Sequence, residues 1–223
     1  MKFLISVLLI IPFWSFSTTQ IFGTALNSVG EWVYLYEIEE FVTNAEKYVQ
    51  KFKTTEKNRF YFELEHQEVK RYMIRINNSY SEIYLEPNGV YKIIFPEESV
   101  EVIPYFSGRE IELLFLTLDT TDINYKILGF EAWLDDEMAD LYLLKDAEPV
   151  KFIDGILKFK IDVLETYKND SSDYFKKHIK YVLGKTIDNI NYFGSPNELE
   201  KFNFYIRGQA VLYSLPSYMD YFQ

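Results

Sequence analysis

Two patterns of hydrophobic and polar residues divide the chain. From about Ile21 to Leu118, short runs rich in β-branched and aromatic residues follow one another, and several alternate apolar with polar positions. A period of two is typical of β-strands that bury one face. Eight such runs at a spacing of about ten residues predict an antiparallel β-sandwich. The expected strands are residues 31–39, 46–52, 58–66, 69–77, 81–86, 90–95, 100–106 and 110–118.

The strongest turn signal lies in YSEIYLEPNGVYKIIF, between two of these runs. Pro87 fixes its own φ for a turn, and Gly89 accepts the positive φ that a three-residue loop requires. Residues 81–86 and 90–95 are therefore expected to pair with each other as a β-hairpin.

The spacing of the apolar residues changes after residue 118. Residues 119–122 offer capping side chains, and the apolar residues that follow recur at steps of three and four, which predicts an amphipathic helix. Pro149 opens a second helix, Ser172 caps a third, and Ser195 with Glu198 forms a capping box for a fourth. A helical segment of about four helices is expected, and an α+β class for the chain. The core-facing residues should be Ile123, Ile127, Phe130, Leu134, Met138 and Leu141, then Phe152, Ile156, Phe159, Val163 and Tyr167, then Phe175, Ile179, Leu183, Ile187 and Ile190.

The last residues predict one more helix start, at Ser214 and Pro216, because proline is tolerated in a first helical turn. Only seven residues follow Pro216. Such a helix either docks back onto the chain or belongs to an unfinished domain, and we expect the second. The terminal turn should then be frayed, and its apolar side chains should favour self-association. The side chains expected to lack part of their cover are Tyr213, Leu215, Tyr218, Tyr221 and Phe222.

The N-terminus has the pattern of an export signal. Lys2 precedes an apolar run from Phe3 to Phe16, which is too short for a ~30 Å hydrocarbon core that needs about twenty residues. Ser15 and Ser17 supply small residues for cleavage after Ser17. The alternative is an uncleaved anchor. We expect residues 1–17 to be a signal peptide, the mature chain to have no membrane span, and its location to be the periplasm or the cell surface.

Composition narrows the function classes. The net charge is −11, and no basic stripe is present, so nucleic acid and anionic membranes are not expected partners. The chain has no cysteine, which excludes a lipid-modified cysteine, disulfides and Cys-x-x-Cys redox chemistry within these 223 residues. The 19 tyrosines, 19 phenylalanines and three tryptophans are spread along the chain, which favours core filling over a stacking surface.

No catalytic, cofactor-binding or metal-binding residue is expected, and no enzyme. His66 lies in a charged stretch that predicts a solvated turn, and His178 lies between lysines on a helix face. An acidic group on the first helix is expected to be a solvated helix face, because no glycine-containing, oxygen-rich loop accompanies it. Its members are Glu131, Asp135, Asp136, Glu137 and Asp140.

Three stretches resemble a known family: YSEIYLEPNGVYKIIFP, EIELLFLTLDTTDINYKILGFEAWLDD and VLYSLPSYMDYF. They resemble the N-terminal region of secreted thioredoxin-like proteins of Bacteroidota, especially flavobacteria. In those proteins a small all-β domain and a helical segment precede a TlpA-type thiol-disulfide oxidoreductase domain. The likeness runs from about Ile21 to the last residue, and its most specific part spans Glu110 to Asp136.

The resemblance implies a thioredoxin-like domain in cis that this sequence lacks, so no catalytic residue of that family has a counterpart here. The residue pattern predicts a signal peptide at 1–17, a β-sandwich domain at 18–118 and a helical domain at 119–223. The resemblance implies that the helical domain is incomplete at its C-terminus and that the chain is a fragment. We expect a non-catalytic exported module that positions the redox domain or recognises its partner. The alternative is a stand-alone module that binds a glycan or a peptide through exposed aromatic side chains. A third possibility, a hydrolase, would need two buried acids about 5–10 Å apart in a cleft.

Overall fold

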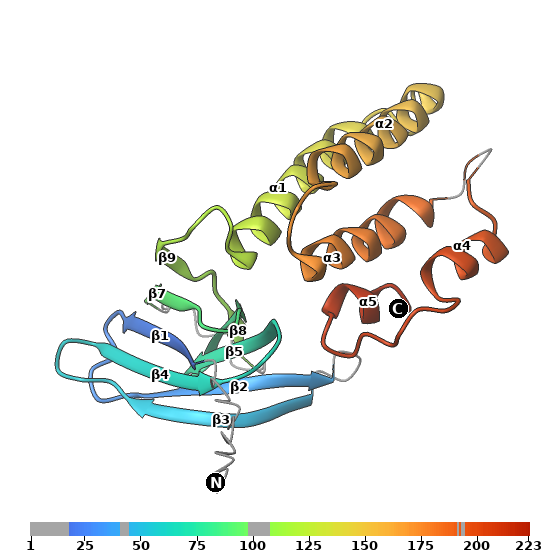
Figure 1. Cartoon of the computed structure of the whole chain (residues 1–223). Coiled ribbons are helices and arrows are strands. Elements are labelled where there is room, and N and C mark those ends of the chain that lie inside the picture. Colours follow the sequence, from blue (N-terminus) through green and yellow to red (C-terminus); the bar gives the residue numbers. More distant parts are fainter. Residues whose placement is uncertain (1–17, 41–44, 98–107, 191, 193–194) are drawn as a thin grey trace, which may run out of the picture.

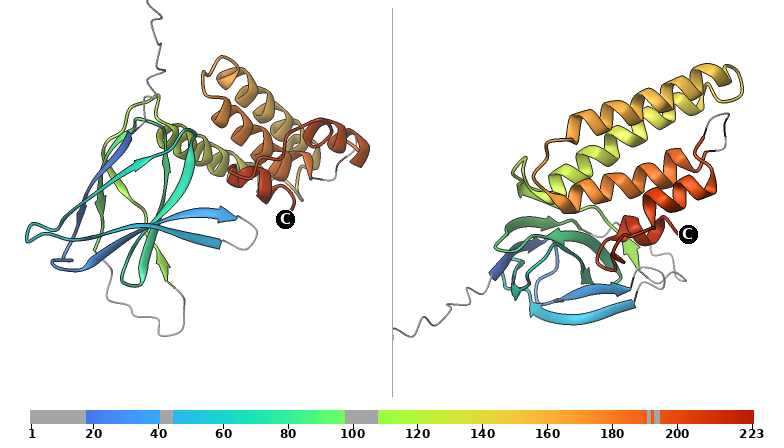
Figure 2. Two further views of the ribbon diagram at one scale, coloured as in Figure 1. Left: turned by 60° about the horizontal axis from the view of Figure 1, so that its bottom comes forward. Right: turned by 45° about the vertical axis from the view of Figure 1, so that its right-hand side comes forward.

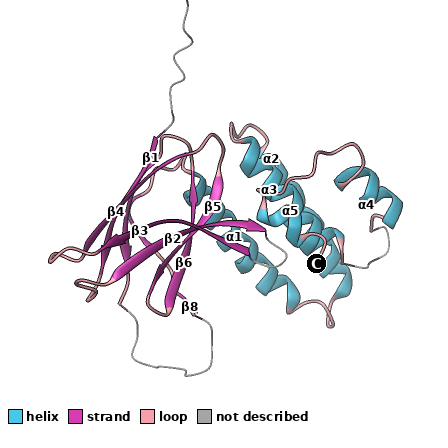
Figure 3. Ribbon diagram, turned by 90° about the horizontal axis from the view of Figure 1, so that it is seen from below, coloured by secondary structure: helices cyan, strands magenta, loops and turns pink. Residues whose placement is uncertain are grey.

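The structure, a computed structural model, describes residues 18–40, 45–97, 108–190, 192 and 195–223. The expected α+β class is confirmed, because strands fill the first half of the chain and helices the second (Figure 1). The last strand ends at Thr117 and the first helix begins at Ile123. Figure 3 shows the strands gathered on one side of the molecule and the helices on the other.

The described residues contain nine strands. They include every expected run except 100–106, which lies outside the described residues. The run at 110–118 is divided between two short strands. The strands are β1 (Thr18–Ala25), β2 (Trp32–Glu40), β3 (Ala45–Lys53), β4 (Arg59–Glu65), β5 (Lys70–Ile76), β6 (Ser79–Leu85), β7 (Val90–Phe95), β8 (Arg109–Glu110) and β9 (Leu114–Thr117).

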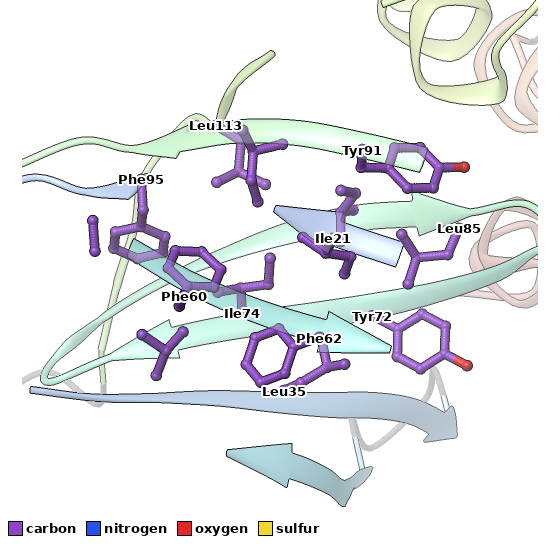
Figure 4. Close-up of a cluster of buried hydrophobic side chains, with 14 of the residues drawn as sticks. Ile21, Leu35, Phe60, Phe62, Tyr72, Ile74, Leu85, Tyr91, Phe95 and Leu113 are labelled. Atoms are coloured by element: carbon purple, nitrogen blue, oxygen red, sulfur yellow. The ribbon is translucent and has the colours of Figure 1, made fainter. Parts of the chain in front are cut away.

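The strands form two sheets that face each other across one hydrophobic core. Sheet A has the strand order β4-β1-β7-β9, and sheet B has the order β3-β2-β5-β6-β8. This arrangement agrees roughly with the expected sandwich, but the pairing is not purely antiparallel, because β1 pairs parallel with β7 and β6 pairs parallel with β8. Figure 4 shows side chains of both sheets, among them Ile21, Leu35 and Phe60, meeting in this core.

Strand β1, in the interior of sheet A, is absent from the expected strands. Its inward positions are Thr19, Ile21, Gly23 and Ala25, of which only Ile21 is large, so the hydrophobic alternation is weak. Gly23 is required because a Cβ there would lie 2.0 Å from the ring of Phe60. Since Thr19 already lies in the core, cleavage after residue 17 would leave this strand whole.

The expected hairpin of β6 and β7 is wrong. A turn does form, with Asn88 at positive φ and the Gly89 N–H donating to the carbonyl of Glu86, but β6 belongs to sheet B and β7 to sheet A. The turn therefore crosses between the sheets. The two-residue hairpin is β5–β6, where Ile76 pairs with Ser79 and Asn77 has a φ of 51°. Turn chemistry determines the reversal of the chain but not the partner of each strand.

The described helices follow the expected apolar stripes closely. All six core-facing positions expected in the first helix are buried, and so are four of the five in the second. Asp122 caps the first helix and Ser172 the third through side-chain hydrogen bonds. There are five α-helices in the described residues rather than about four. They are α1 (Ile123–Tyr142), α2 (Pro149–Tyr167), α3 (Asp173–Leu183), α4 (Glu198–Tyr205) and α5 (Pro216–Asp220), and a π-helical turn, η1 (Gly184–Asp188), extends α3.

The expected capping box of α4 is displaced by two residues. Asn197 is the N-cap, accepting from the backbone N–H of Glu200, whose side chain accepts from the Asn197 N–H in return. Ser195 instead accepts from the backbone N–H of Tyr192 at 3.5 Å. Asn197 is as good a cap as serine, and the sequence offers both residues, which explains the error.

The expected loss of cover at the C-terminus is wrong for Leu215 and Tyr218 but is confirmed for Tyr213 and Phe222. Helix α5 docks against α3 and sheet B, as both views of Figure 2 show. Leu215, the N-cap, and Tyr218 are buried, while Tyr213 and Phe222 are exposed. Met219 reaches the outer face of sheet B. This one-turn helix is therefore held by packing on two sides rather than by its own length.

A buried amide joins the helices to sheet B. The Asn124 side chain of α1 accepts from the Tyr84 N–H at 2.9 Å and donates to the Tyr84 carbonyl at 2.8 Å. It thereby satisfies both backbone groups at an edge position of β6, as a neighbouring strand would. Asp122 in turn accepts from the Asn124 amide at 2.9 Å, which fixes its orientation.

Replacing Asn124 with alanine should cost about 1–3 kcal/mol of stability, because both backbone groups of Tyr84 would lose their partner in a buried place. Urea unfolding of this variant measures the loss. Tyr125→Ala, at the exposed neighbouring position, is the control and should change stability by less than about 0.5 kcal/mol. Equal effects of the two substitutions would contradict this role of Asn124.

Candidate functional site

The outer face of sheet B carries a row of aromatic side chains. Along β2 the inward residues Val33 and Leu35 are fully buried, so the alternate residues Trp32, Tyr34 and Tyr36 lie on the opposite face. The pairing of the strands adds Tyr48 beside Tyr36, and Arg75 joins Tyr34 to Tyr80. We call this set the aromatic face: Trp32, Tyr34, Tyr36, Tyr48 and Tyr80.

Three rings of the aromatic face contact one another, and Trp32 and Tyr48 are exposed. Tyr34 and Tyr36 stack with ring centroids 6.2 Å apart, and Tyr48 meets Tyr36 edge-on at 6.1 Å. Trp32 is 41 % exposed and Tyr48 53 % exposed. Isolated exposed apolar side chains are ordinary, but several aromatic side chains gathered on one face of a sheet are typical of a binding surface.

Cationic side chains surround this row. Lys51 Nζ lies 4.5 Å from the ring centre of Trp32, and the Arg75 guanidinium lies 5.1 Å from that of Tyr36. Arg75 also donates to Glu46 at 2.6 Å, which holds the guanidinium beside the ring. In a chain of net charge −11, this face presents hydrogen-bond donors beside aromatic rings.

One end of the row is closed and the other is open. Beyond Tyr36, the next outward residue of β2 is Ile38, which packs with Met73 under Met219 of α5. The helical half thus covers this end of the sheet, while Trp32 lies at the far end. The free part of the aromatic face is therefore the stretch from Trp32 to Tyr36 with its neighbours on β3 and β5.

A second candidate is a cleft of about 530 Å³ between β6, the segment after β8, and α1. Burial raises the pKa of Glu82 in this cleft, and Arg71, which donates to it at 2.8 Å, opposes the rise. Glu110 and Glu112 are exposed, and the Glu131 side chain is 47 % exposed. Among the described residues that line it, the cleft therefore lacks the two buried acids expected of a hydrolase.

The histidines do not form a site. His66 lies in a turn as expected, but it is buried rather than solvated, and its Nδ1 lies 2.7 Å from the Glu68 carbonyl oxygen. His178 is buried against Phe130, with Nε2 3.3 Å from Glu131 but without hydrogen-bond geometry. Within the residues that the structure describes, no three side chains of the metal-ligating types gather. Asp135, Asp136 and Asp140 are exposed, as expected of a solvated helix face.

A buried ionic cluster lies at η1, where the sequence predicts no ion pair. Asp188 is 3 % exposed and accepts from Lys160 at 2.5 Å and from the Tyr205 hydroxyl. Burial, reinforced by Asp188, raises the pKa of Tyr205, which keeps that hydroxyl a donor. Gly184 makes room for this cluster, because a Cβ there would lie 2.8 Å from the Tyr205 ring. Asp188 thus binds both Lys160 of α2 and Tyr205 of α4, so the cluster joins α2, η1 and α4.

The sequence analysis did not assign the aromatic face to particular strands or residues. The run EWVYLYEIE is apolar or aromatic on both sides, so it does not show which side is covered. The signal that could have found it is the alternation of aromatic residues with aliphatic ones in β2, since the aliphatic side faces the core.

Neither the membrane-span criterion nor the comparisons with known proteins assign a function to the chain. Among the described residues, no helix has the length and apolar content needed to cross a membrane. No family model matches the sequence, and no curated protein matches it. The function therefore has to be argued from the residues themselves.

Proposed function

We propose that this chain is a non-catalytic recognition module whose aromatic face binds a glycan chain. The observation that carries the proposal is the row of Trp32, Tyr34 and Tyr36 on the outer face of sheet B, where Trp32 is exposed and the two tyrosines are half-buried. A strand spaces alternate side chains by about 7 Å, so the row offers successive rings along β2.

The chemistry of a glycan suits this surface. A pyranose ring has an apolar face of C–H groups that can lie on an aromatic ring, and hydroxyl groups at its rim. Lys51, Lys53 and Arg75 stand beside the rings and can donate to such hydroxyls. A standard protein interface buries about 800 Å² per partner around an apolar centre, whereas this row is narrow and has charged side chains within it. A glycan is therefore the better occupant.

The resemblance to secreted thioredoxin-like proteins supports a companion proposal. In it, the chain is exported through cleavage of residues 1–17 and stands in cis before a thioredoxin-like domain, with residues 18–118 as the sandwich and 119–223 as the helical domain. This proposal rests on the quoted sequence stretches alone. Sequencing the gene beyond codon 223 tests it, and a stop codon there would contradict it.

Affinity electrophoresis tests the glycan proposal. The chain from Thr18 onward should be retarded by at least one gel in a panel of neutral and acidic polysaccharides. Tyr34→Ala should remove the retardation, because an aromatic contact worth about 1 kcal/mol or more sets the affinity of a weak binder. Tyr61→Ala is the matched control, since Tyr61 contacts Phe22 on the outer face of sheet A. Absence of retardation in every gel would contradict the proposal, as would equal retardation of all variants.

A further inference from the structure

Helix α2 has a second apolar face that points away from the molecule. Its buried residues serve the helical core, but Val150, Leu157, Ile161 and Leu164 lie on the opposite side and are 36 to 70 % exposed. At about 100° and 1.5 Å per residue, these four occupy about 60° of arc and extend about 21 Å along the helix. We call them the α2 stripe. A helix that is apolar on both faces is normally covered on both.

The charged residues beside the α2 stripe match a second copy of themselves. Lys151, Asp154, Lys158 and Asp162 all lie on the same side of the stripe and are exposed. Their signs alternate along the helix. When two such helices run antiparallel about a two-fold axis at Leu157, Asp154 of one copy faces Lys158 of the other, and Lys151 faces Asp162.

The same register also matches the apolar residues. With Leu157 on the axis, Val150 of one copy lies opposite Leu164 of the other. Ile161 lies opposite Ile153, which is only partly buried in its own helical core. One register thus pairs every member of the stripe with an apolar residue and each of these four charges with its opposite.

We propose that the α2 stripe is the interface of a homodimer in which two α2 helices pack antiparallel about Leu157. This interface is independent of the aromatic face, which lies in the other half of the chain. A dimer would present two aromatic faces, and binding a repetitive ligand through both would raise its avidity.

Light scattering after size-exclusion chromatography tests the dimer. The chain from Thr18 onward should be dimeric at about 100 µM, and dimer formation should weaken on dilution. Ile161→Asp should raise the dissociation constant at least about tenfold, because it buries a charge at the interface. Leu199→Asp is the matched control at an exposed leucine of α4 and should leave the dimer unchanged. Circular dichroism should show equal helix content in all three proteins.

Two further variants test the register. Asp154→Lys should weaken the dimer, and the added Lys158→Asp should restore it. Because the chain has no cysteine, Leu157→Cys should cross-link under oxidation, whereas Val150→Cys should not, since its copies would be about 21 Å apart. A monomer at every concentration would overturn the proposal, as would a dimer that is insensitive to Ile161→Asp. Cross-linking through Val150→Cys but not Leu157→Cys would overturn the antiparallel register.

Discussion

Replacing Tyr218 with alanine should lower the free energy of unfolding by about 3–5 kcal/mol, the usual cost of removing a large buried aromatic side chain. Tyr218 is 6 % exposed, and its ring meets that of Tyr181 edge-on at 4.8 Å. Its loss opens a cavity between α3 and α5 that rigid neighbours cannot close. Urea unfolding, followed by far-ultraviolet circular dichroism, measures the change.

The matched control for this experiment is Tyr213→Ala. Tyr213 lies five residues earlier and is exposed, so its removal should change stability by less than about 0.5 kcal/mol. Hydrogen exchange gives an independent reading, because the amides of Tyr218 and Tyr221 donate within or near α5 and should be protected. A loss below about 1 kcal/mol for Tyr218→Ala, or fast exchange throughout α5, would restore the expectation of a frayed end.

Asp188→Ala should cost about 3 kcal/mol, because removing one partner of a buried ion pair leaves the other groups uncompensated. Lys160 would keep its charge beside an empty space, and the Tyr205 hydroxyl would lose its acceptor. The Lys160 side chain is 25 % exposed and can turn partly toward water, which places the loss at the lower end of the range for buried pairs.

Asp188→Asn separates the two parts of this loss. The amide oxygen still accepts from Tyr205, so this variant should cost less than alanine, and the remaining loss belongs to the charge on Lys160. Adding Lys160→Met to Asp188→Ala should recover part of the stability, since it removes the unpaired charge. Equal losses for alanine and asparagine would contradict a hydrogen-bonding role for Asp188, and both are measured by urea unfolding.

The helices could be predicted far better than the sheets. Ile123, Phe130 and Phe159 recur at helical spacing whatever their partners are, so the sequence shows their buried face directly. Strand β1 carries its inward face on Thr19, Gly23 and other small residues, which leave no hydrophobic signal. The partners of β6 and β7 depend on contacts far apart in the chain, which no local turn signal contains.

The site was less predictable than the fold, and for a different reason. The aromatic face depends on which side of β2 is covered, and that in turn depends on β4 and β7, which supply the opposite wall of the core. The Asp188 cluster depends on the meeting of α2, η1 and α4. Neither arrangement has a sequence spacing of its own, because the groups converge only in three dimensions.

Isothermal titration with the polysaccharide that retards the chain most strongly is the most direct test of the aromatic face as a recognition site. The chain from Thr18 onward should give saturable heats. Tyr34→Ala and Trp32→Ala should each weaken the affinity about tenfold or more, while Tyr61→Ala should bind as the unchanged chain does. Equal affinity of the Tyr34→Ala and Tyr61→Ala variants would contradict the account, and so would the absence of saturable binding to any polysaccharide.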